Sequence, residues 1–335
     1  MTAGTRPGPG ILAGRTATTR RAVLAAPIAV PALAFAEGYP SRPVRMIIPF
    51  APGGSSDLAA RLVAQRMTTA TGQQFVAENR GGAGGDLAMM AGIAAAPDGY
   101  TYLIGGDPWQ VRNPVMRTNI PYDTDRALMT VARMVITWSV LAIPRSLPVS
   151  NLAEYVAYLR AAREPVSYGT SGSGTLSHVL GLMFMRRHGI PAEPVPYRGS
   201  SLALQDVAAG RLSLMCPTAG GLLPLLTGPH LRVLAITGDR RQPMFPDAPT
   251  MAEAGMPELD LSSWYGGMVP AGTPAAVIER LSALTGAALA DPEIAQRLED
   301  QGVAPAFLPN PAFNDWIMAQ RLVWRDIAER TNLHF

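Results

Sequence analysis

Two loops rich in glycine and serine are the places where this chain could bind a small anion. The first, residues 52–57, reads Pro-Gly-Gly-Ser-Ser-Asp, and the second, residues 170–175, reads Thr-Ser-Gly-Ser-Gly-Thr. Their glycines let a ligand approach the backbone closely, and their hydroxyl groups can donate hydrogen bonds. If each loop opens a helix, the unbonded N–H groups of that helix start favour an anion over a cation.

The flanking residues predict a strand before each loop and a helix after it. The first loop follows the apolar run of residues 44–50 and precedes apolar residues at helical spacing, namely Ala59, Leu62, Val63 and Met67. The second loop follows residues 166–169 and precedes the helical stripe Leu176, Val179, Leu180, Met183 and Phe184. For the first loop alone, an ordinary strand-to-helix turn capped by Ser55 or Ser56 is an equal alternative.

Strand-like runs alternate with helical segments, which predicts an α/β fold with mainly parallel sheets. The C-terminal part is expected to be helical, with helix starts at Pro274, at Asp291 and Pro292, and at Pro311. Both halves combine a strand, a loop and a helix, so we expect two facing domains that hold an anion between two helix starts. The expected strands are residues 44–50, 74–78, 101–104, 139–143, 166–169, 193–197, 212–216 and 231–237.

The N-terminal residues 1–36 predict an export signal that is removed. They contain four arginines and no acid, and an apolar stretch, residues 22–36, is broken by Pro27 and Pro31 and ends in Ala-Phe-Ala. This stretch is too short to span a bilayer, so cleavage is favoured over anchoring. The mature chain is expected to begin near Glu37. A pair of arginines precedes the apolar stretch, which fits either a twin-arginine or a general secretory signal.

The composition excludes several classes of function. Without the leader, 28 basic residues minus 4 leave 24 against 25 acids, a net charge of −1, so no basic face for nucleic acid is indicated. The chain contains no lysine, which excludes a Schiff-base lysine and a P-loop lysine. Its single cysteine, Cys216, excludes an internal disulfide and leaves stability to packed cores.

A series of motifs along nearly the whole mature chain resembles the Bug-type periplasmic solute receptors of tripartite tricarboxylate transport systems. The motifs lie in the family's order, which makes the set specific although each alone is weak. In the first half they are Tyr-Pro-Ser-Arg-Pro-Val (39–44), Pro-Phe-Ala-Pro-Gly-Gly-Ser-Ser-Asp (49–57), Glu-Asn-Arg-Gly-Gly-Ala-Gly-Gly (78–85) and Pro-Asp-Gly-Tyr (97–100). The others are Pro-Tyr-Arg-Gly-Ser (196–200), Pro-Thr-Met-Ala-Glu-Ala-Gly (249–255), Ser-Trp-Tyr-Gly (263–266) and Pro-Ala-Gly-Thr-Pro (270–274).

The resemblance implies a two-lobed periplasmic-binding-protein fold, type II-like, with a mainly parallel sheet flanked by helices in each lobe. Lobe 1 would comprise residues 37–137 and 262–335, and lobe 2 residues 138–261. The lobes would close over a small carboxylate and deliver it to membrane permease subunits. The resemblance therefore implies a monomeric periplasmic receptor that is not an enzyme and needs no cofactor or metal. A ligand-sensing receptor for a signalling partner is the alternative with the same fold.

The resemblance also implies the residues of the binding site. Residues 52–57 and 171–175 match the family's carboxylate-binding loops, while residues 105–107 should form another wall of the cleft. Trp109, His178, Thr218 and Tyr265 are expected to decide which ligand is bound. The proposed ligand-binding residues are Pro52, Gly53, Gly54, Ser55, Ser56, Asp57, Gly105, Asp107, Trp109, Ser171, Gly172, Ser173, Gly174, Thr175, His178, Pro217 and Thr218.

Three departures from the family bear on the ligand. Pro217 and Thr218 stand where many relatives carry an Asp-Asn pair, so a ligand ammonium would lose its partner and a plain carboxylate is favoured over an amino acid. Asp107 and Trp109 stand where small hydroxyl residues are expected. Trp109 could offer the ligand an aromatic surface, but packing at the base of the loop is favoured. For His178, donation to a ligand oxygen and a solvent-facing position are equal alternatives.

Other chemistry is disfavoured by spacing. Ser171, Ser173 and His178 could suggest a serine hydrolase, but the loop lacks the Gly-x-Ser-x-Gly of a nucleophile elbow. The remaining histidines, His188, His230 and His334, have no metal-ligand spacing. Residues 82–87 fail the dinucleotide fingerprint at their last position.

Overall fold

The computed structural model describes residues 38–50, 52–197, 199–225, 228 and 230–332. The predicted signal peptide, residues 1–36, lies outside the described residues, as do Glu37 and His334. Among the described residues, no helix combines the length and the apolar character that crossing a membrane requires.

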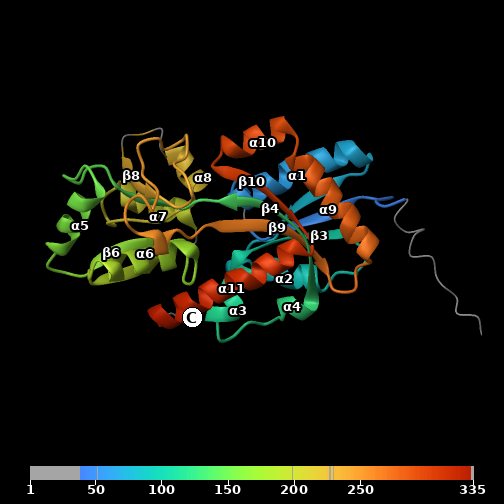
Figure 1. Ribbon diagram of the computed structural model, residues 1–335, viewed down its shortest axis with the longest axis horizontal. Helices are drawn as coiled ribbons and strands as arrows, with labels where there is room; N and C mark the ends of the chain where they lie inside the picture. Colours follow the sequence, from blue (N-terminus) through green and yellow to red (C-terminus); the bar gives the residue numbers. More distant parts are fainter. Residues whose placement is uncertain (1–37, 51, 198, 226–227, 229, 333–335) are drawn as a thin grey trace, which may run out of the picture. The chain divides into compact units, whose positions relative to one another are not determined.

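One mixed sheet of six strands organises the first part of the fold, with strand order β10-β4-β9-β3-β1-β2 (Figure 1). β1 pairs in parallel with β2 and β3, whereas β9 is antiparallel to both β3 and β4, and β10 is antiparallel to β4. β1 to β4 therefore run in one direction and β9 and β10 in the other. The strands are β1 (Val44–Ile48), β2 (Phe75–Asn79), β3 (Thr101–Gly106), β4 (Leu128–Thr137), β9 (Ser263–Pro270) and β10 (Val303–Pro309).

Four further strands lie between β4 and β9 in the sequence: β5 (Val140–Pro144), β6 (Val166–Thr170), β7 (Ala192–Pro196) and β8 (Leu231–Ile236). β5 is antiparallel to β8, and β6 is parallel to β7. Met215 links the two pairs through single bridges to Ala142 and Gly169. The strand predicted at residues 212–216 is therefore reduced to isolated bridges. We call the part built on the six-stranded sheet lobe 1 and the part built on β5 to β8 lobe 2.

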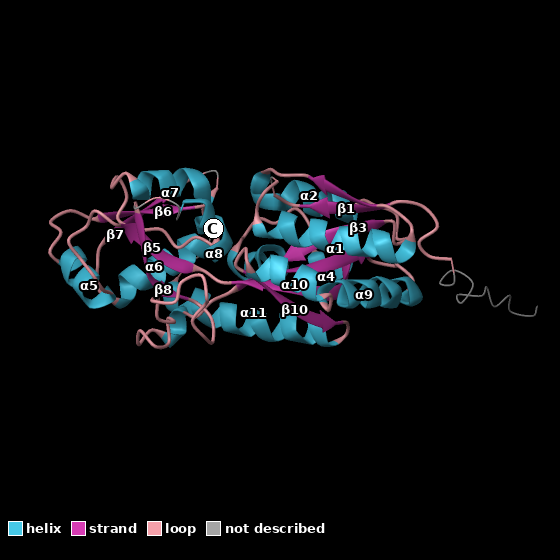
Figure 2. Cartoon of the chain, turned by 90° about the horizontal axis from the view of Figure 1, so that it is seen from above, coloured by secondary structure: helices cyan, strands magenta, loops and turns pink. Residues whose placement is uncertain are grey.

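Helices cover both faces of the lobe 1 sheet, as Figures 1 and 2 show. Alternate residues of β1 face opposite cores: Met46 and Ile48 pack with α1 and α9, and Ile47 packs in the cluster that includes residues of α2 and α11. This alternation follows from the two-residue period of a strand. The helices of lobe 1 are α1 (Ser55–Thr71), α2 (Asp86–Ile93), α3 (Asn113–Met116), α4 (Thr124–Ala127), α9 (Ala275–Leu289), α10 (Pro292–Glu299) and α11 (Ala312–Thr331).

The remaining helical segments lie mainly in lobe 2. They are α5 (Leu152–Arg160), α6 (Leu176–Arg187), α7 (Ser200–Ala208), α8 (Ala219–Leu222) and the 3₁₀ turns η3 (Leu223–Leu225) and η4 (Pro257–Leu259). Lobe 1 adds the 3₁₀ turn η1 (Ala83–Gly85) and the π-helical turn η2 (Pro108–Arg112). The predicted C-terminal helix starts agree with α9, α10 and α11 to within one residue.

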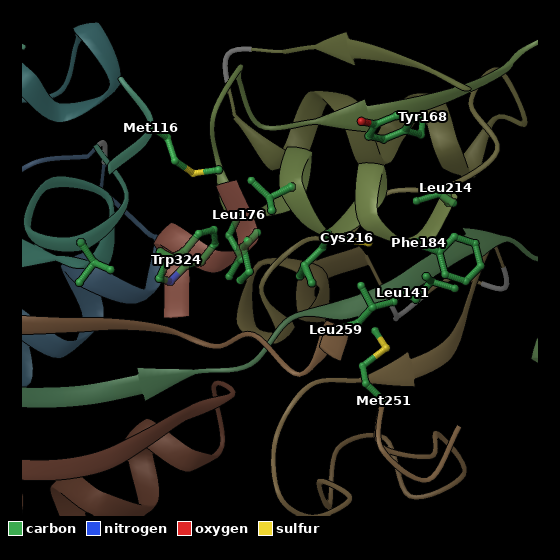
Figure 3. Packing of buried hydrophobic residues seen from close by; sticks show 14 of the residues in the cluster. Met116, Leu141, Tyr168, Leu176, Phe184, Leu214, Cys216, Met251, Leu259 and Trp324 are labelled. Atoms are coloured by element: carbon green, nitrogen blue, oxygen red, sulfur yellow. The ribbon is translucent and has the colours of Figure 1, made fainter. Parts of the chain in front are cut away.

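One hydrophobic cluster contains residues of both lobes. Met116 and Trp324 enter it from lobe 1, and Leu176 and Cys216 from lobe 2, as Figure 3 shows. Burial raises the pKa of the Cys216 thiol to about 12, so this residue is a small apolar core side chain. The predicted lobe boundaries, residues 37–137 with 262–335 and residues 138–261, stay a prediction.

Candidate functional site

The first loop has the predicted form of strand, glycine turn and helix start. Its N-cap residue is Gly54, in an extended conformation (φ −86°, ψ 170°), and no side chain caps α1. Gly53 has φ +92°, which favours glycine because a Cβ is strained there. Among the described residues, no acceptor bonds the backbone N–H groups of Ser56 and Asp57. The alternative of a turn capped by Ser55 or Ser56 is therefore not observed, and these N–H groups have no acceptor within the described part of the chain.

The Asp57 side chain, in contrast, is turned back into the loop. It is only 4% exposed, and its carboxylate accepts the N–H of Gly53 (3.0 Å), the Nδ2 of Asn79 (2.8 Å) and the Nε of Arg61 (2.9 Å). Burial alone raises the pKa of this carboxyl, but these hydrogen bonds outweigh burial and hold the pKa below its usual value. Asp57 thus shapes the loop, and only its backbone is available to a ligand.

The second loop also has the predicted position, between β6 and α6, but most of its N–H groups are already bonded. Thr175 is the N-cap residue of α6, and its hydroxyl donates to the carbonyl of Gly172 (2.7 Å). Among the described residues, the N–H of Ser173 alone in residues 171–175 has no acceptor. The bonded pairs are Ser171 N with Ser177 Oγ (2.9 Å), Gly172 N with Thr170 Oγ1 (3.2 Å), Gly174 N with His178 Nδ1 (3.1 Å) and Thr175 N with Gly172 O (3.3 Å).

This internal bonding differs from the expectation that the N–H groups of both helix starts are free to hold an anion. Hydroxyl groups next to the loop, including that of Ser177, compete successfully for its backbone donors. The second loop therefore offers the N–H and hydroxyl of the exposed Ser173 rather than a row of free backbone amides. Ser177 had no motif that could have revealed this role, because its hydroxyl acts only once the loop has folded over it.

Of the two alternatives for His178, the solvent-facing position is wrong, whereas donation to a ligand oxygen stays a prediction. It is 9% exposed, and its Nδ1 accepts the N–H of Gly174. Such a bond requires Nδ1 without a proton. Burial lowers the pKa of the imidazole, which keeps the acceptor available near neutral pH.

His178 is expected to make the stability of the protein depend on pH. Because its pKa is lower in the folded state than the value of about 6.5 in the unfolded state, the unfolded chain binds more protons between these two values. The contribution is therefore complete above about pH 6.5 and is lost as the pH falls towards the folded pKa. Denaturant unfolding of the wild type at several pH values should show this loss as a slope of the free energy of unfolding against pH.

His178→Asn is the matched control, since its side-chain oxygen can accept the same N–H and does not titrate. The slope should decrease in this variant, while His188, whose pKa burial also lowers, contributes equally to both proteins. An unchanged slope would contradict the role of His178.

The wall expected at the end of β3 is closed in by side chains. The N–H of Gly106 donates to Oε1 of Gln110 (2.9 Å). A Cβ added to Gly105 would lie 3.0 Å from Oε1 of Gln110 and from two side-chain atoms of Met268. Gly105 is therefore needed for close packing, and in this structure it faces neighbouring side chains rather than an open cleft.

Asp107 is also directed inwards, contrary to the expectation that it faces the ligand. Its side chain is 2% exposed and pairs with the Nε of Arg112 at 2.6 Å. Its second carboxylate oxygen accepts the hydroxyl of Ser263. Both oxygens are thus committed within lobe 1, because an ionised carboxylate can be buried only with charged and hydrogen-bonding partners.

Trp109 lies at the base of the loop, the alternative that the sequence favoured. It is fully buried, and its indole N–H donates to the carbonyl of Gly84 at 3.2 Å. Its ring also lies 5.4 Å from that of Phe50, centroid to centroid. In this structure the Trp109 ring is therefore a packed core side chain at the base of the loop, and Tyr265 is 8% exposed.

The chain segment with Pro217 and Thr218 lies beside the first loop. Thr218 is the N-cap residue of α8, and the carbonyl of Pro217 accepts the N–H of Val140 at 3.0 Å. A Cβ added to Gly220 would lie 3.4 Å from the hydroxyl oxygen of Ser55. The structure thus brings these segments of lobe 2 and lobe 1 together, and their place in one binding site stays a prediction.

A second contact joins the lobes at the other loop. The Nη1 of Arg112, in lobe 1, donates to the carbonyl of Gly174 at 2.7 Å. Arg112 could not be predicted as such a contact, since an isolated arginine in an apolar segment has no motif. Asn79 and Ser263 lie in the motifs of residues 78–85 and 263–266, but their bonds to the buried Asp57 and Asp107 were not predicted.

Two cavities lined by described residues lie away from the loops. A depression of about 680 Å³ in lobe 2 is lined by α5, β8 and residues 247–254, and one of about 190 Å³ in lobe 1 includes Trp109 and Tyr122. Neither includes a residue of 52–57 or 171–175. Free backbone donors at a helix start are a more specific indication of carboxylate binding than volume. Within the described part of the chain, no group of three or more His, Cys, Asp or Glu residues could hold a metal.

Two α/β lobes with helix-opening loops at the carboxyl ends of their strands define a two-lobed solute-binding protein. The chain belongs to the tripartite tricarboxylate transporter receptor family, whose model matches residues 59–333. The resemblance and the fold expected from the sequence are thereby confirmed. Since this is a family of binding receptors, the expectation that the protein is not an enzyme is confirmed as well.

Known proteins similar to this chain include protein BugT of Bordetella pertussis, which is 32% identical over 298 residues, 88% of this chain and 91% of BugT. The structure of Rpa4515 of R. palustris with adipate has a TM-score of 0.83 and 30% identity, covering 88% of this chain and 99% of that one. MatC of Rhodopseudomonas palustris with bound malate has a TM-score of 0.76 and 28% identity, covering 86% and 99%.

Proposed function

We propose that this protein is the periplasmic substrate-binding receptor of a tripartite tricarboxylate-type transporter. It captures a small carboxylate between its lobes and delivers it to the membrane permease subunits. In this proposal the protein is a monomer, and residues 1–36 are an export signal that is cleaved. Residues 37–137 and 262–335 form one lobe, and residues 138–261 form the other. The neighbours with adipate and malate support a carboxylate as ligand.

The observation that carries the proposal is the uncapped start of α1. Two backbone N–H groups, those of Ser56 and Asp57, are free to bind one carboxylate. Ser173 adds an N–H and a hydroxyl from lobe 2. Each hydrogen bond to a charged oxygen contributes about 1.5–3 kcal/mol. Three or four of them supply roughly the 8 kcal/mol of micromolar affinity, with part of the gross energy offset by ordering.

The charges near the loops favour a plain carboxylate over an amino acid. Asp57 and Asp107 are the acidic residues among the proposed site residues, and the carboxylates of both are bonded to internal partners. Pro217 and Thr218 carry no charge. A ligand ammonium would therefore be desolvated without an anionic partner, which is unfavourable.

Closing of the lobes is a shift of population in this proposal. The ligand contacts residues 52–57 in lobe 1 and residues 171–175 in lobe 2 together only when the lobes are closed. It therefore stabilises the closed state by its differential affinity.

Calorimetry on the mature chain tests the proposal. We expect a member of a panel of mono-, di-, tri- and aromatic carboxylates to bind with a Kd of about micromolar, and the corresponding amino acids to bind more weakly. Mass spectrometry of ligand retained through purification identifies further candidates for the panel. If no carboxylate binds, the proposed function is wrong.

A gene deletion separates transport from sensing. In the deletion strain, uptake of the identified carboxylate should fall. Unchanged uptake would contradict delivery to a permease and favour a receptor that reports its ligand to a signalling partner.

A further inference from the structure

Arg112 is a buried cation that contacts both lobes. Its side chain is 5% exposed, in the turn η2 between β3 and α3. Within lobe 1, its Nε donates to Asp107 at 2.6 Å, and its guanidinium carbon lies 5.5 Å from the centroid of a ring of Trp324. From this position, its Nη1 donates to the carbonyl of Gly174 in the second loop at 2.7 Å.

The partners of Arg112 in lobe 1 leave it little freedom. Asp107 is itself held by the hydroxyl of Ser263, in the strand β9 at the centre of the sheet. A guanidinium presents its donors in a rigid planar fork, so fixing Nε also fixes the direction of Nη1. The carbonyl of Gly174 therefore bonds to a donor whose position is set by lobe 1.

The hydrogen bonds within the second loop are local. Its own hydrogen bonds, to Ser177, Thr170 and His178, connect it only to neighbouring residues of β6 and α6. They shape the loop but do not determine where it lies relative to residues 52–57. The bond from Arg112 links the loop directly to lobe 1.

We propose that Arg112 is a positioning residue for carboxylate capture, because it holds residues 171–175 in a fixed position relative to residues 52–57. This inference rests on the proposed function of the two loops. In the buried pair, the carboxylate of Asp107 balances the charge of the Arg112 guanidinium. The Nη1 of Arg112 then holds the loop through the carbonyl of Gly174.

Two variants separate the effect of the hydrogen bond from Arg112 to Gly174 from the effect of the charge of Arg112. Arg112→Lys keeps a cation beside Asp107, but an ammonium is a point charge and cannot extend a fork to both partners. The double variant Asp107→Asn with Arg112→Met removes both charges together, so neither is left buried without a partner. Arg126→Lys, at a side chain that is 89% exposed, is the matched control for the substitution itself.

Hydrogen exchange of the ligand-free mature protein provides a test that needs no ligand. In both variants, amides of residues 171–175 should exchange about tenfold faster, the change expected for one lost hydrogen bond. Exchange in β1 and α1 and the melting temperature of Arg112→Lys should stay close to those of wild type and Arg126→Lys. Unchanged exchange of residues 171–175 in Arg112→Lys overturns the proposal, whether or not the double variant folds.

Carboxylate affinity provides the second measurement. For a ligand that binds the wild type, Kd should rise about tenfold in Arg112→Lys and stay unchanged in Arg126→Lys. Faster loop exchange without a change in Kd would show that Arg112 orders the loop but does not position it for capture, which also overturns the proposal. If the wild type binds no carboxylate, the proposed function fails, while the exchange data still decide whether Arg112 holds the loop.

Discussion

Replacing Gly54 with aspartate is expected to stabilise the fold slightly and to weaken carboxylate binding strongly. Gly54 is the N-cap residue of α1 with an extended backbone, and a Cβ added there meets no atom within 4 Å. Aspartate is a preferred N-cap residue, whose side chain accepts the N–H of the second or third helical residue. Those residues are Ser56 and Asp57, the proposed anion donors.

The two effects of Gly54→Asp have different sizes. An N-cap aspartate in place of glycine stabilises a helix by a few tenths of a kcal/mol. A ligand must displace the new carboxylate and loses about two hydrogen bonds of 1.5–3 kcal/mol each. Kd should therefore rise by about a hundredfold or more, as calorimetry with the carboxylate found for the wild type can measure.

Gly54→Asn is the matched control, because asparagine caps the helix without a charge. It should give a similar stability and a smaller loss of affinity, and Gly54→Ala, which cannot cap, should bind nearly as well as wild type. Tight binding by Gly54→Asp would place the carboxylate away from the start of α1 and refute this part of the site.

Trp109→Ala is expected to destabilise the protein by about 3–5 kcal/mol, the usual loss for a buried tryptophan. Trp109 is fully buried and its indole N–H is bonded to Gly84. The reduced stability should appear as a lower midpoint in denaturant unfolding. Relative affinities for aromatic and aliphatic carboxylates should stay the same, because the ring does not reach the ligand.

The partly buried Trp316 serves as the control for removal of a tryptophan. Trp316→Ala should reduce the free energy of unfolding by less than Trp109→Ala. A second variant tests the packing directly: Gly85 has φ +98°, and an added Cβ would lie 2.2 Å from the ring of Trp109. Gly85→Ala should therefore destabilise the wild type more than it destabilises Trp109→Ala. Altered ligand preference in Trp109→Ala without loss of stability would restore the ligand-facing interpretation.

Local sequence patterns predicted the first elements of lobe 1 but not the three strands that complete its sheet, β4, β9 and β10. β1, the first loop and α1 follow from an apolar run, a glycine turn and helical spacing within a short window. β9 reads Ser-Trp-Tyr-Gly-Gly-Met-Val-Pro and is buried along its whole length, so it lacks the alternation typical of a strand with one exposed face. β4 and β10 were missed as well, and the C-terminal part was expected to be only helical.

The binding site stays a prediction, but the structure shows which of its expected residues lie together and where their side chains point. Residues 52–57 open a helix as expected, and the segment at Thr218 lies beside them. The carboxylates of Asp57 and Asp107, however, face inwards, because each finds donors that are distant in the sequence, Asn79 for one and Ser263 for the other. No spacing rule relates these pairs, since they meet only when the strands assemble.

From the sequence alone one predicts two helix-opening loops that suit an anion, since glycine, serine and helical spacing act within a few residues. Only the tertiary structure decided which donors remain free. It left the start of α1 uncapped, bonded most N–H groups of the second loop to Thr170, Ser177 and His178, and placed Arg112 between the lobes. The physical reason is that a hydrogen-bond donor is available to a ligand only after the packed chain has satisfied its internal acceptors.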